Sequence, residues 1–251
     1  MDSHSTWWNL LPGYDNLQAL LQTNVVYGET HEIVAQHIFG AALVALFLLV
    51  GALSGSRVFR AGPVPAKRFG LAAIFDAVLG VAAGLCKDII GGHEWKRYFP
   101  LIATLGLFIL FSNLLGLIPG FAPPTDNLET TAVCGVIVFL YYNFHGFRVN
   151  GIKVLTHMAN PMGVWWGWFL APLMFPVELV GHLARPLSLA LRLRGNMFGD
   201  HMVIALFAGI LPIVLPMPFL MLGTLVCMIQ AFVFCVLSCV YISMAVAHDD
   251  H

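Results

Sequence analysis

The stretch Arg185-Pro186-Leu187-Ser188-Leu189-Ala190-Leu191-Arg192-Leu193-Arg194-Gly195-Asn196-Met197 places three arginines inside an apolar run that extends from about residue 164 to about residue 208. A run of about 45 residues is more than twice the length that a helix needs to cross a bilayer upright. It therefore forms either two short helices or one long helix that lies strongly tilted. A second apolar run, at about 219–247, follows a linker, residues 210–218, that contains three prolines and no charge.

The composition of the whole chain indicates a membrane protein. Of its 251 residues, 59% are apolar and only 10% are charged, whereas soluble domains carry about 25% charged residues. The mean hydropathy is +0.84. A net charge of −1 gives no electrostatic case for nucleic-acid binding. Residues 1–16 contain no Lys or Arg and no early apolar core, so we expect no cleaved secretory signal.

Three shorter apolar runs precede the long one, at about 34–53, 101–117 and 131–147. Residues 69–92 differ because Asp76, Lys87 and Asp88 interrupt them, which favours an amphipathic helix at the membrane interface. The pattern predicts an all-α membrane protein with about five membrane helices and one interfacial helix. We divide the chain into an outer N-terminal segment, 1–33, a region of three spans, 34–147, and a C-terminal region, 148–251.

The distribution of positive charge predicts the orientation. Nine of the twelve Lys and Arg residues fall in segments that this map places in the cytoplasm, and none falls in an outer loop. Because cytoplasmic loops of membrane proteins are rich in Lys and Arg, we expect the N-terminus outside and the C-terminus in the cytoplasm. The other three, Arg185, Arg192 and Arg194, lie inside the long apolar run.

An arginine at membrane depth costs about 2.5 to 3.5 kcal/mol on insertion scales, so these three residues need partners or water. At about 100° per residue, one narrow helical face, within about 40° of Glu178, carries most of the polar residues of the run. These are Glu178, His182, Arg185, Arg192, Asn196 and Asp200. Arg194 lies about 160° from Glu178. Arg192 has no carboxylate three or four residues away, so its partner must come from another helix, another chain or water.

For most of these residues a structural role is an open alternative. Arg185 and Arg194 can extend to the membrane interface or form salt bridges within the bundle. Glu178 precedes Arg185 by seven residues, so the two form an ion pair or Glu178 lines a water-filled path. Asp200 and His201 can be a solvated helix end, and His182 fits either role. The polar side chains of Ser188, Asn196 and Gln230 can bond the helix backbone, and Gln230 gains interest only if it faces Arg192.

The arginine stretch resembles the core motif of subunit a of F-type ATP synthases, approximately (K/R)-P-(L/V)-S-L-(G/A)-x-R-L-(F/x)-G-N-(M/I). The run Ile229-Gln230-Ala231-Phe232-Val233-Phe234, with Tyr241-Ile242-Ser243, resembles the second motif of that family, on its last helix. Shorter stretches resemble its outer loop and the end of its second span: Pro123-Pro124-Thr125, Thr130-Thr131, and Asn113 with Leu114, Leu117 and Pro119. The resemblance covers about residues 30–248.

The resemblance implies that the last two helices form a long tilted hairpin and that Arg192 faces a rotating ring of c subunits. It further implies that Gln230 lies near that arginine, Asn196 near the proton path, and Glu178 along a half-channel. The implied partners are the c-ring, the peripheral-stalk b subunits, the other ATP synthase subunits and the lipid of a bacterial inner membrane. No cofactor or metal is expected, and nucleotide chemistry belongs to partner subunits because the chain has no G-x-x-x-x-G-K-[ST] motif.

The chain departs from the family pattern at the outer side. Many members carry Glu at the position of His201, and some carry His at the position of Gly223. Asp126 and Glu129 flank Asn127, where the family more often has Asp. We therefore expect a rearranged proton entrance in which Asp200 or His201 substitutes.

The expected function is that of a proton-translocating stator subunit, which is not an enzyme on its own. Arg192 and Gln230 would act at the ring interface. A proton would enter from the outer side past Asp126, Glu129, Asp200, His201 and Glu178, with His182, Ser188 and Asn196 also along the path. Two alternatives are a small secondary transporter with a buried Glu–Arg–His site and a scaffold whose polar residues only assemble helices.

Overall fold

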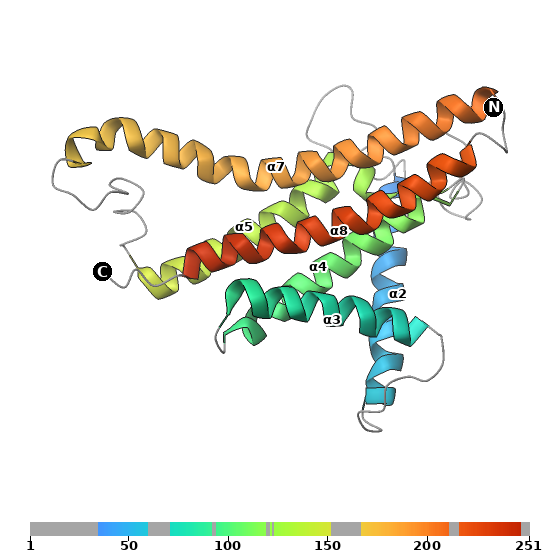
Figure 1. The fold of residues 1–251 in the computed structure, drawn as a ribbon, viewed down its shortest axis with the longest axis horizontal. Coiled ribbons are helices and arrows are strands. Elements are labelled where there is room, and N and C mark those ends of the chain that lie inside the picture. Colours follow the sequence, from blue (N-terminus) through green and yellow to red (C-terminus); the bar gives the residue numbers. More distant parts are fainter. Residues whose placement is uncertain are drawn as a thin grey trace.

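The computed structural model describes residues 35–59, 71–91, 94–118, 121, 123–151, 167–210 and 216–246. All regular structure in these ranges is helical: α2 (Ala35–Phe59), α3 (Leu71–Ile90), α4 (Trp95–Gly116), the short 3₁₀ helix η2 (Pro124–Asp126), α5 (Leu128–Asn150), α7 (Gly167–Ile210) and α8 (Pro216–Val246) (Figure 1). The all-α prediction is confirmed over these ranges. The N-terminal segment, 1–33, lies outside the described residues.

Three of the described helices, α4, α5 and α8, are long and apolar enough to cross a membrane. The apolar part of α2, His37–Leu53, is shorter. Both α4 and α5 begin earlier than predicted, because Trp95–Pro100 continue the first and Asn127 caps the second. The Asn127 side chain accepts a hydrogen bond from the Glu129 backbone N–H at 3.0 Å, which satisfies one of the free donors at a helix start.

The long apolar run forms one helix, α7, of 44 residues, although Pro172, Pro176 and Pro186 lie inside it. At 1.5 Å per residue its length is about 66 Å, roughly twice the hydrocarbon thickness, so it cannot stand upright in a bilayer. The next helix begins at Pro216, which corrects the predicted linker: residues 216–218 are helical. Proline is tolerated in a first turn because the N–H that it lacks has no intrahelical partner there.

The two C-terminal helices run antiparallel and lie across α4 and α5 (Figure 1). Their register follows from two contacts: Arg185 lies over the ring of Tyr241, whereas Asn196, further along α7, bonds to Gln230, further back along α8. The core lies between α3, α4, α5 and α8, where Tyr98, Ile109 and Phe234 are buried. All five cysteines are free and buried.

The ends of the helices fall into two groups, as an alternating membrane topology requires. The 3₁₀ helix packs against α2, α4, α5 and α7. The Nδ1 atom of His37, near the start of α2, lies 3.3 Å from the carbonyl oxygen of Pro123, just before η2. The start of α2 therefore shares one end of the bundle with the α4–α5 connection.

Apolar side chains cover much of the outer surface of the chain. Leu46, Leu49 and Leu53 of α2 are each more than half exposed, as are Leu140 of α5 and Leu206 of α7. Exposed apolar surface of this extent is expected where lipid or a partner subunit is the neighbour.

Helices α5 and α7 approach each other closely at Gly135, where a Cβ atom would lie 2.9 Å from the carbonyl oxygen of Pro186. We expect Gly135→Val to push the helices apart and destabilise the subunit by about 1–3 kcal/mol. The thermal midpoint of the detergent-extracted complex measures this. Gly80→Ala on α3 is the control, because nothing lies within 4 Å of its added Cβ. Equal midpoints for the two variants would contradict the packing.

Candidate functional site

The polar residues of α7 line the border of its buried face. That face carries Leu189, Ala190, Leu193 and Met197, all nearly inaccessible. On a helical projection the buried face is centred about 75° from Glu178, whereas the predicted polar stripe spans about 40° on either side of it. The stripe therefore lies where α7 meets its neighbours at one edge, with apolar packing on one side of it and open surface on the other.

Arg192 is exposed on the surface of the chain and has no hydrogen bond or ion pair within the described ranges. Arg194 is exposed as well, so exposure does not separate the two arginines. Their neighbours do: Arg192 lies between Arg185 and Asn196 on the polar edge, whereas Arg194 lies beyond the opposite border of the buried face.

Beside Arg192, α7 presents a surface that we call the small-residue strip, formed by Gly181, Ala184, Ser188, Gly195 and Gly199. These residues lie within an arc of about 60°, opposite the buried face. An added Cβ would find nothing within 4 Å at Gly181, Gly195 or Gly199. Because its side chains are small, the strip is a shallow surface along which another helix can approach the backbone of α7 closely.

One helical turn beyond Arg192, α7 is tied to α8 by an amide pair. The Nδ2 atom of Asn196 donates to Oε1 of Gln230 at 2.6 Å. Gln230 is buried, and its Nε2 atom has no partner in the described chain. The structure therefore brings two of the predicted site residues together, with Gln230 facing Asn196 and not Arg192.

One turn further, the carboxylate of Asp200 faces α8 at Gly223. Its buried Oδ2 atom lies 3.7 Å from the position that a Cβ of Gly223 would take, and it has no partner among the described residues. The side chain of Leu117, directly after α4, lies closer to the same position, at 2.9 Å. The glycine therefore leaves room for Leu117, and the carboxylate lies beside it at ordinary contact distance. His201, the next residue, is partly exposed.

A second polar group lies near this end, where α4 meets η2. Asn113 and Thr125 belong to the stretches that resemble the family, but no role at the site was expected for either. Thr125 Oγ1 donates to Asn113 Oδ1 at 2.7 Å. Both residues are buried, and the Nδ2 atom of Asn113 and the hydroxyl of the neighbouring Ser112 have no partner in the described chain. The available signal was a pair of adjacent polar residues inside an otherwise apolar span, Ser112-Asn113.

At the other end of α7, polar and aromatic side chains of three helices meet. The Nε2 atom of His182 lies 2.8 Å from Oδ1 of Asn143 on α5. The guanidinium of Arg185 lies 5.5 Å from the centre of the Tyr241 ring on α8, and the Tyr142 ring contacts both His182 and Tyr241. We call these five residues the α5–α7–α8 cluster. Asn143 and Tyr142 were missed, although an asparagine within a span is itself a signal.

The sequence suggested two sets of neighbours for Glu178, an ion-pair partner in Arg185 and the outer acids. Among the described residues Arg185 forms no ion pair with Glu178, and it stacks on Tyr241 instead. Glu178 also lies far from Asp200 along α7, since 22 positions of one continuous helix, about 33 Å, separate the two. Glu178 lies one turn from His182, on the far side of Arg192.

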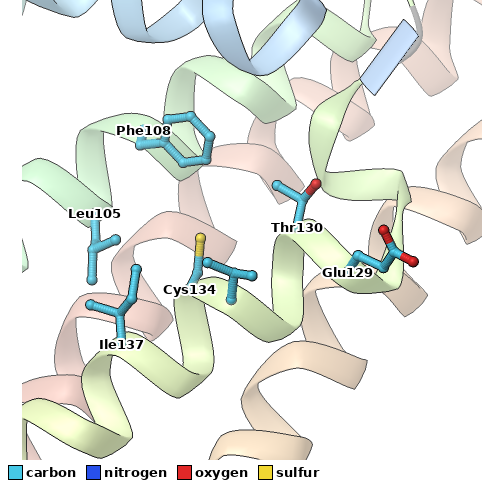
Figure 2. A pocket seen from close by; sticks show the side chains of 7 residues that line it. Leu105, Phe108, Glu129, Thr130, Cys134 and Ile137 are labelled. Carbon is cyan, nitrogen blue, oxygen red and sulfur yellow. The ribbon is translucent and has the colours of Figure 1, made fainter. Parts of the chain in front are cut away.

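The two acids of the connection between α4 and α5 are Asp126 and Glu129. Asp126 ends η2 and is half-buried. Glu129 is exposed and lines an open pocket of about 380 Å³ between α4 and α5, with Phe108, Cys134 and Ile137 (Figure 2). Figure 2 shows the Glu129 carboxylate and the Thr130 hydroxyl towards one end of the lining, with apolar side chains towards the other. Among the described residues, neither acid forms a hydrogen bond or ion pair with Asp200 or His201. Within the same ranges, no three His, Cys, Asp or Glu side chains are placed to hold a metal ion.

Comparisons with known proteins agree on one family. Residues 34–243 match the family described as ATP synthase A chain. The chain is 44% identical to ATP synthase subunit a of Bdellovibrio bacteriovorus over 90% of its length and 97% of that protein. It is 45% identical to ATP synthase subunit a of Geobacter sulfurreducens over 82% of its length and 86% of that protein. For ATP synthase subunit a 1 of Syntrophotalea carbinolica the identity is 48%, over 83% and 85%. The chain therefore belongs to the ATP synthase A chain family, the non-nucleotide-binding membrane subunit of the proton-transporting ATP synthase.

Proposed function

We propose that this chain is the stator against which a ring of carboxylate-bearing c subunits rotates, with two offset half-channels that deliver and remove protons. The observation that supports this most is the environment of Arg192. A permanently charged guanidinium lies on a long apolar helix without a counter-charge in the described chain, beside the small-residue strip. A charge at membrane depth is costly unless a partner or water reaches it.

The small-residue strip fits a partner helix. In membranes, helices associate by close packing at small residues because apolar burial gives no advantage over lipid. The strip is not used within the described chain, since Gly181, Gly195 and Gly199 have open space above them. A c-subunit helix seated there would bring its carboxylate to Arg192.

The outer half-channel is proposed to lie between α4, α7 and α8, along Asp200, Asn196 and Gln230. Buried polar groups of proteins are almost always bonded, to water where no protein partner is available. Asp200 Oδ2, Gln230 Nε2 and Asn113 Nδ2 are buried without protein partners in the described structure. Water at these atoms would connect the outer side to the ring, with Asp126, Glu129 and His201 nearer the surface.

The cytoplasmic half-channel is proposed to run on the other side of Arg192, along Ser188, His182 and Glu178. This assignment places the α5–α7–α8 cluster between the ring and the positively charged ends of the helices. Arg148 lies at such an end, in the last turn of α5. By the positive-inside rule that end is cytoplasmic, with the N-terminus outside in a bacterial inner membrane. The peripheral-stalk b subunits and the other ATP synthase subunits complete the assembly.

Two energies act on the ring: the attraction of a ring carboxylate to Arg192 and the energy of a proton driven by the membrane potential. Their magnitudes are compatible with rotation. A carboxylate about 4 Å from a guanidinium gains about 4 kcal/mol at an effective dielectric near 20, before desolvation. A proton driven by 100 mV supplies about 2.3 kcal/mol. The attraction to Arg192 therefore directs the ring without trapping it. Because a guanidinium does not release its proton in proteins, Arg192 also separates the two half-channels.

We expect Arg192→Ala to abolish ATP-driven proton pumping in inverted membrane vesicles, because the ring loses its fixed counter-charge and the half-channels lose their separation. Arg194→Ala is the control, because Arg194 is also exposed and lies two residues further along α7. This variant should pump within about twofold of wild type. Normal pumping by an assembled Arg192→Ala complex would refute the proposal. Loss of assembly in that variant, with c subunits no longer co-purifying, would support the scaffold alternative.

Asp200→Asn should lower proton pumping by about tenfold or more, because the amide keeps the shape of the side chain and removes the group that exchanges protons. Asp88→Asn, at an exposed position of α3, makes the same chemical change outside the proposed path and should have little effect. Initial rates of acidification in vesicles with matched amounts of assembled complex provide the comparison. Equal rates for the two variants would remove Asp200 from the path.

A further inference from the structure

The contact between α5 and α7 at Asn143 and His182 has a defined hydrogen-bond direction. His182 Nε2 lies 2.8 Å from Asn143 Oδ1. The imidazole is half-buried and contacts two rings of α5, those of Phe139 at 5.2 Å and Tyr142 at 5.4 Å between centroids. An imidazole ring held on two sides in this way has one orientation relative to the amide.

The orientation of the Asn143 amide follows from its second bond. Its Nδ2 atom donates to the carbonyl oxygen of Phe139, one turn back in the same helix, at 2.8 Å. A carbonyl oxygen only accepts, so the amide group that faces Phe139 must be the NH₂. The amide oxygen therefore faces His182, and it too only accepts. His182 must carry a hydrogen on Nε2, which leaves Nδ1 with the free lone pair when the imidazole is neutral.

We propose that Asn143 is a positioning residue that holds His182 in the Nε2–H tautomer, so that Nδ1 takes up and releases the proton on the cytoplasmic half of the path. The proposal rests on the proposed function of the chain. A proton that leaves a ring carboxylate through water binds to Nδ1. The imidazolium then releases a proton from Nδ1 to cytoplasmic water, while the Nε2–H bond to Asn143 persists throughout.

The other charged and titratable groups around His182 are less suited than His182 to take up and release this proton. On α7, Glu178 and Arg185 lie within about one turn of it. Arg185 is directed to the Tyr241 ring of α8. On α5, Tyr142 contacts His182 through its ring. Of the residue types present here, only histidine is one that ordinarily gains and loses a proton within the physiological range. Asn143 carries no charge, so it can set the tautomer without competing for the proton.

A packing role for the pair predicts different results. If the bond only joined α5 to α7, replacing both partners by apolar side chains would be nearly neutral, whereas removing one would leave a buried polar group unpaired. Proton pumping would then change with assembly and would keep its pH dependence. A positioning role acts through His182, so the effect of Asn143 must disappear when His182 is absent.

The test uses the whole complex in inverted vesicles, with ATP-driven pumping measured from about pH 6 to about pH 9, around the range in which histidine titrates. We expect Asn143→Leu to lower the rate roughly tenfold, as is typical when the partner that orients a functional histidine is lost. It should add nothing in a His182→Leu background. Asn143→Asp keeps the shape and the acceptor, and should keep activity while the acid limb of the profile moves to higher pH, because a carboxylate stabilises the imidazolium.

His145→Leu is the matched control. His145 lies two residues further along α5, bonds the Tyr141 carbonyl oxygen of its own helix and packs on Tyr98 of α4. It should leave the pH profile unchanged. An unchanged profile in Asn143→Asp, or an equal loss from Asn143→Leu with and without His182, would overturn the inference. If Arg192→Ala is inactive while assembled Asn143 and His182 variants pump normally, this inference alone fails. If Arg192→Ala pumps normally, the proposed function fails.

Discussion

A guanidinium at membrane depth needs a counter-charge or water, and the rest of this structure is arranged around one that has no counter-charge within the described chain. Arg192 lies near the middle of a single 44-residue helix. The buried face of α7 anchors that helix to its neighbours, and the opposite face carries small residues without cover. The charge is thus held in place by packing on one side and left open on the other, as an interaction with a moving partner requires.

Two polar groups lie on opposite sides of Arg192 along α7. Towards one end, Asn196 pairs with Gln230 of α8, and Asp200 faces α8 at Gly223. Towards the other end, His182 pairs with Asn143 of α5. Antiparallel packing keeps the two groups apart, because each contact further along α7 falls further back along α8. On the proposed function, one long helix that carries both groups would set the two half-channels apart.

The sequence predicted the helices, because apolar runs of sufficient length can be recognised from the sequence alone. The central role of Arg192 stays a prediction, based on its charge in an apolar run and on its helical phase. The sequence left open whether the long run was one helix or two, since the three prolines in α7 are also compatible with a break. It grouped Glu178 with the outer acids, because the phase of a residue does not give its depth. Asn143 was missed because its importance depends on a histidine 39 positions away that only the packing of α5 on α7 brings near. Membership of the ATP synthase A chain family also replaces the transporter alternative.

The claim that a c-subunit helix occupies the strip beside Arg192 can be tested by cysteine crosslinking in the assembled complex. Ser188→Cys lies on the strip, and Leu183→Cys is an exposed position of the same helix about 130° away from its centre. The five native cysteines are buried and leave a low background. With a cysteine introduced beside the ring carboxylate of the c subunit, the account predicts an a–c disulfide from position 188 and none from position 183. A disulfide from position 183 alone, or none from position 188 in an assembled and active complex, would contradict it.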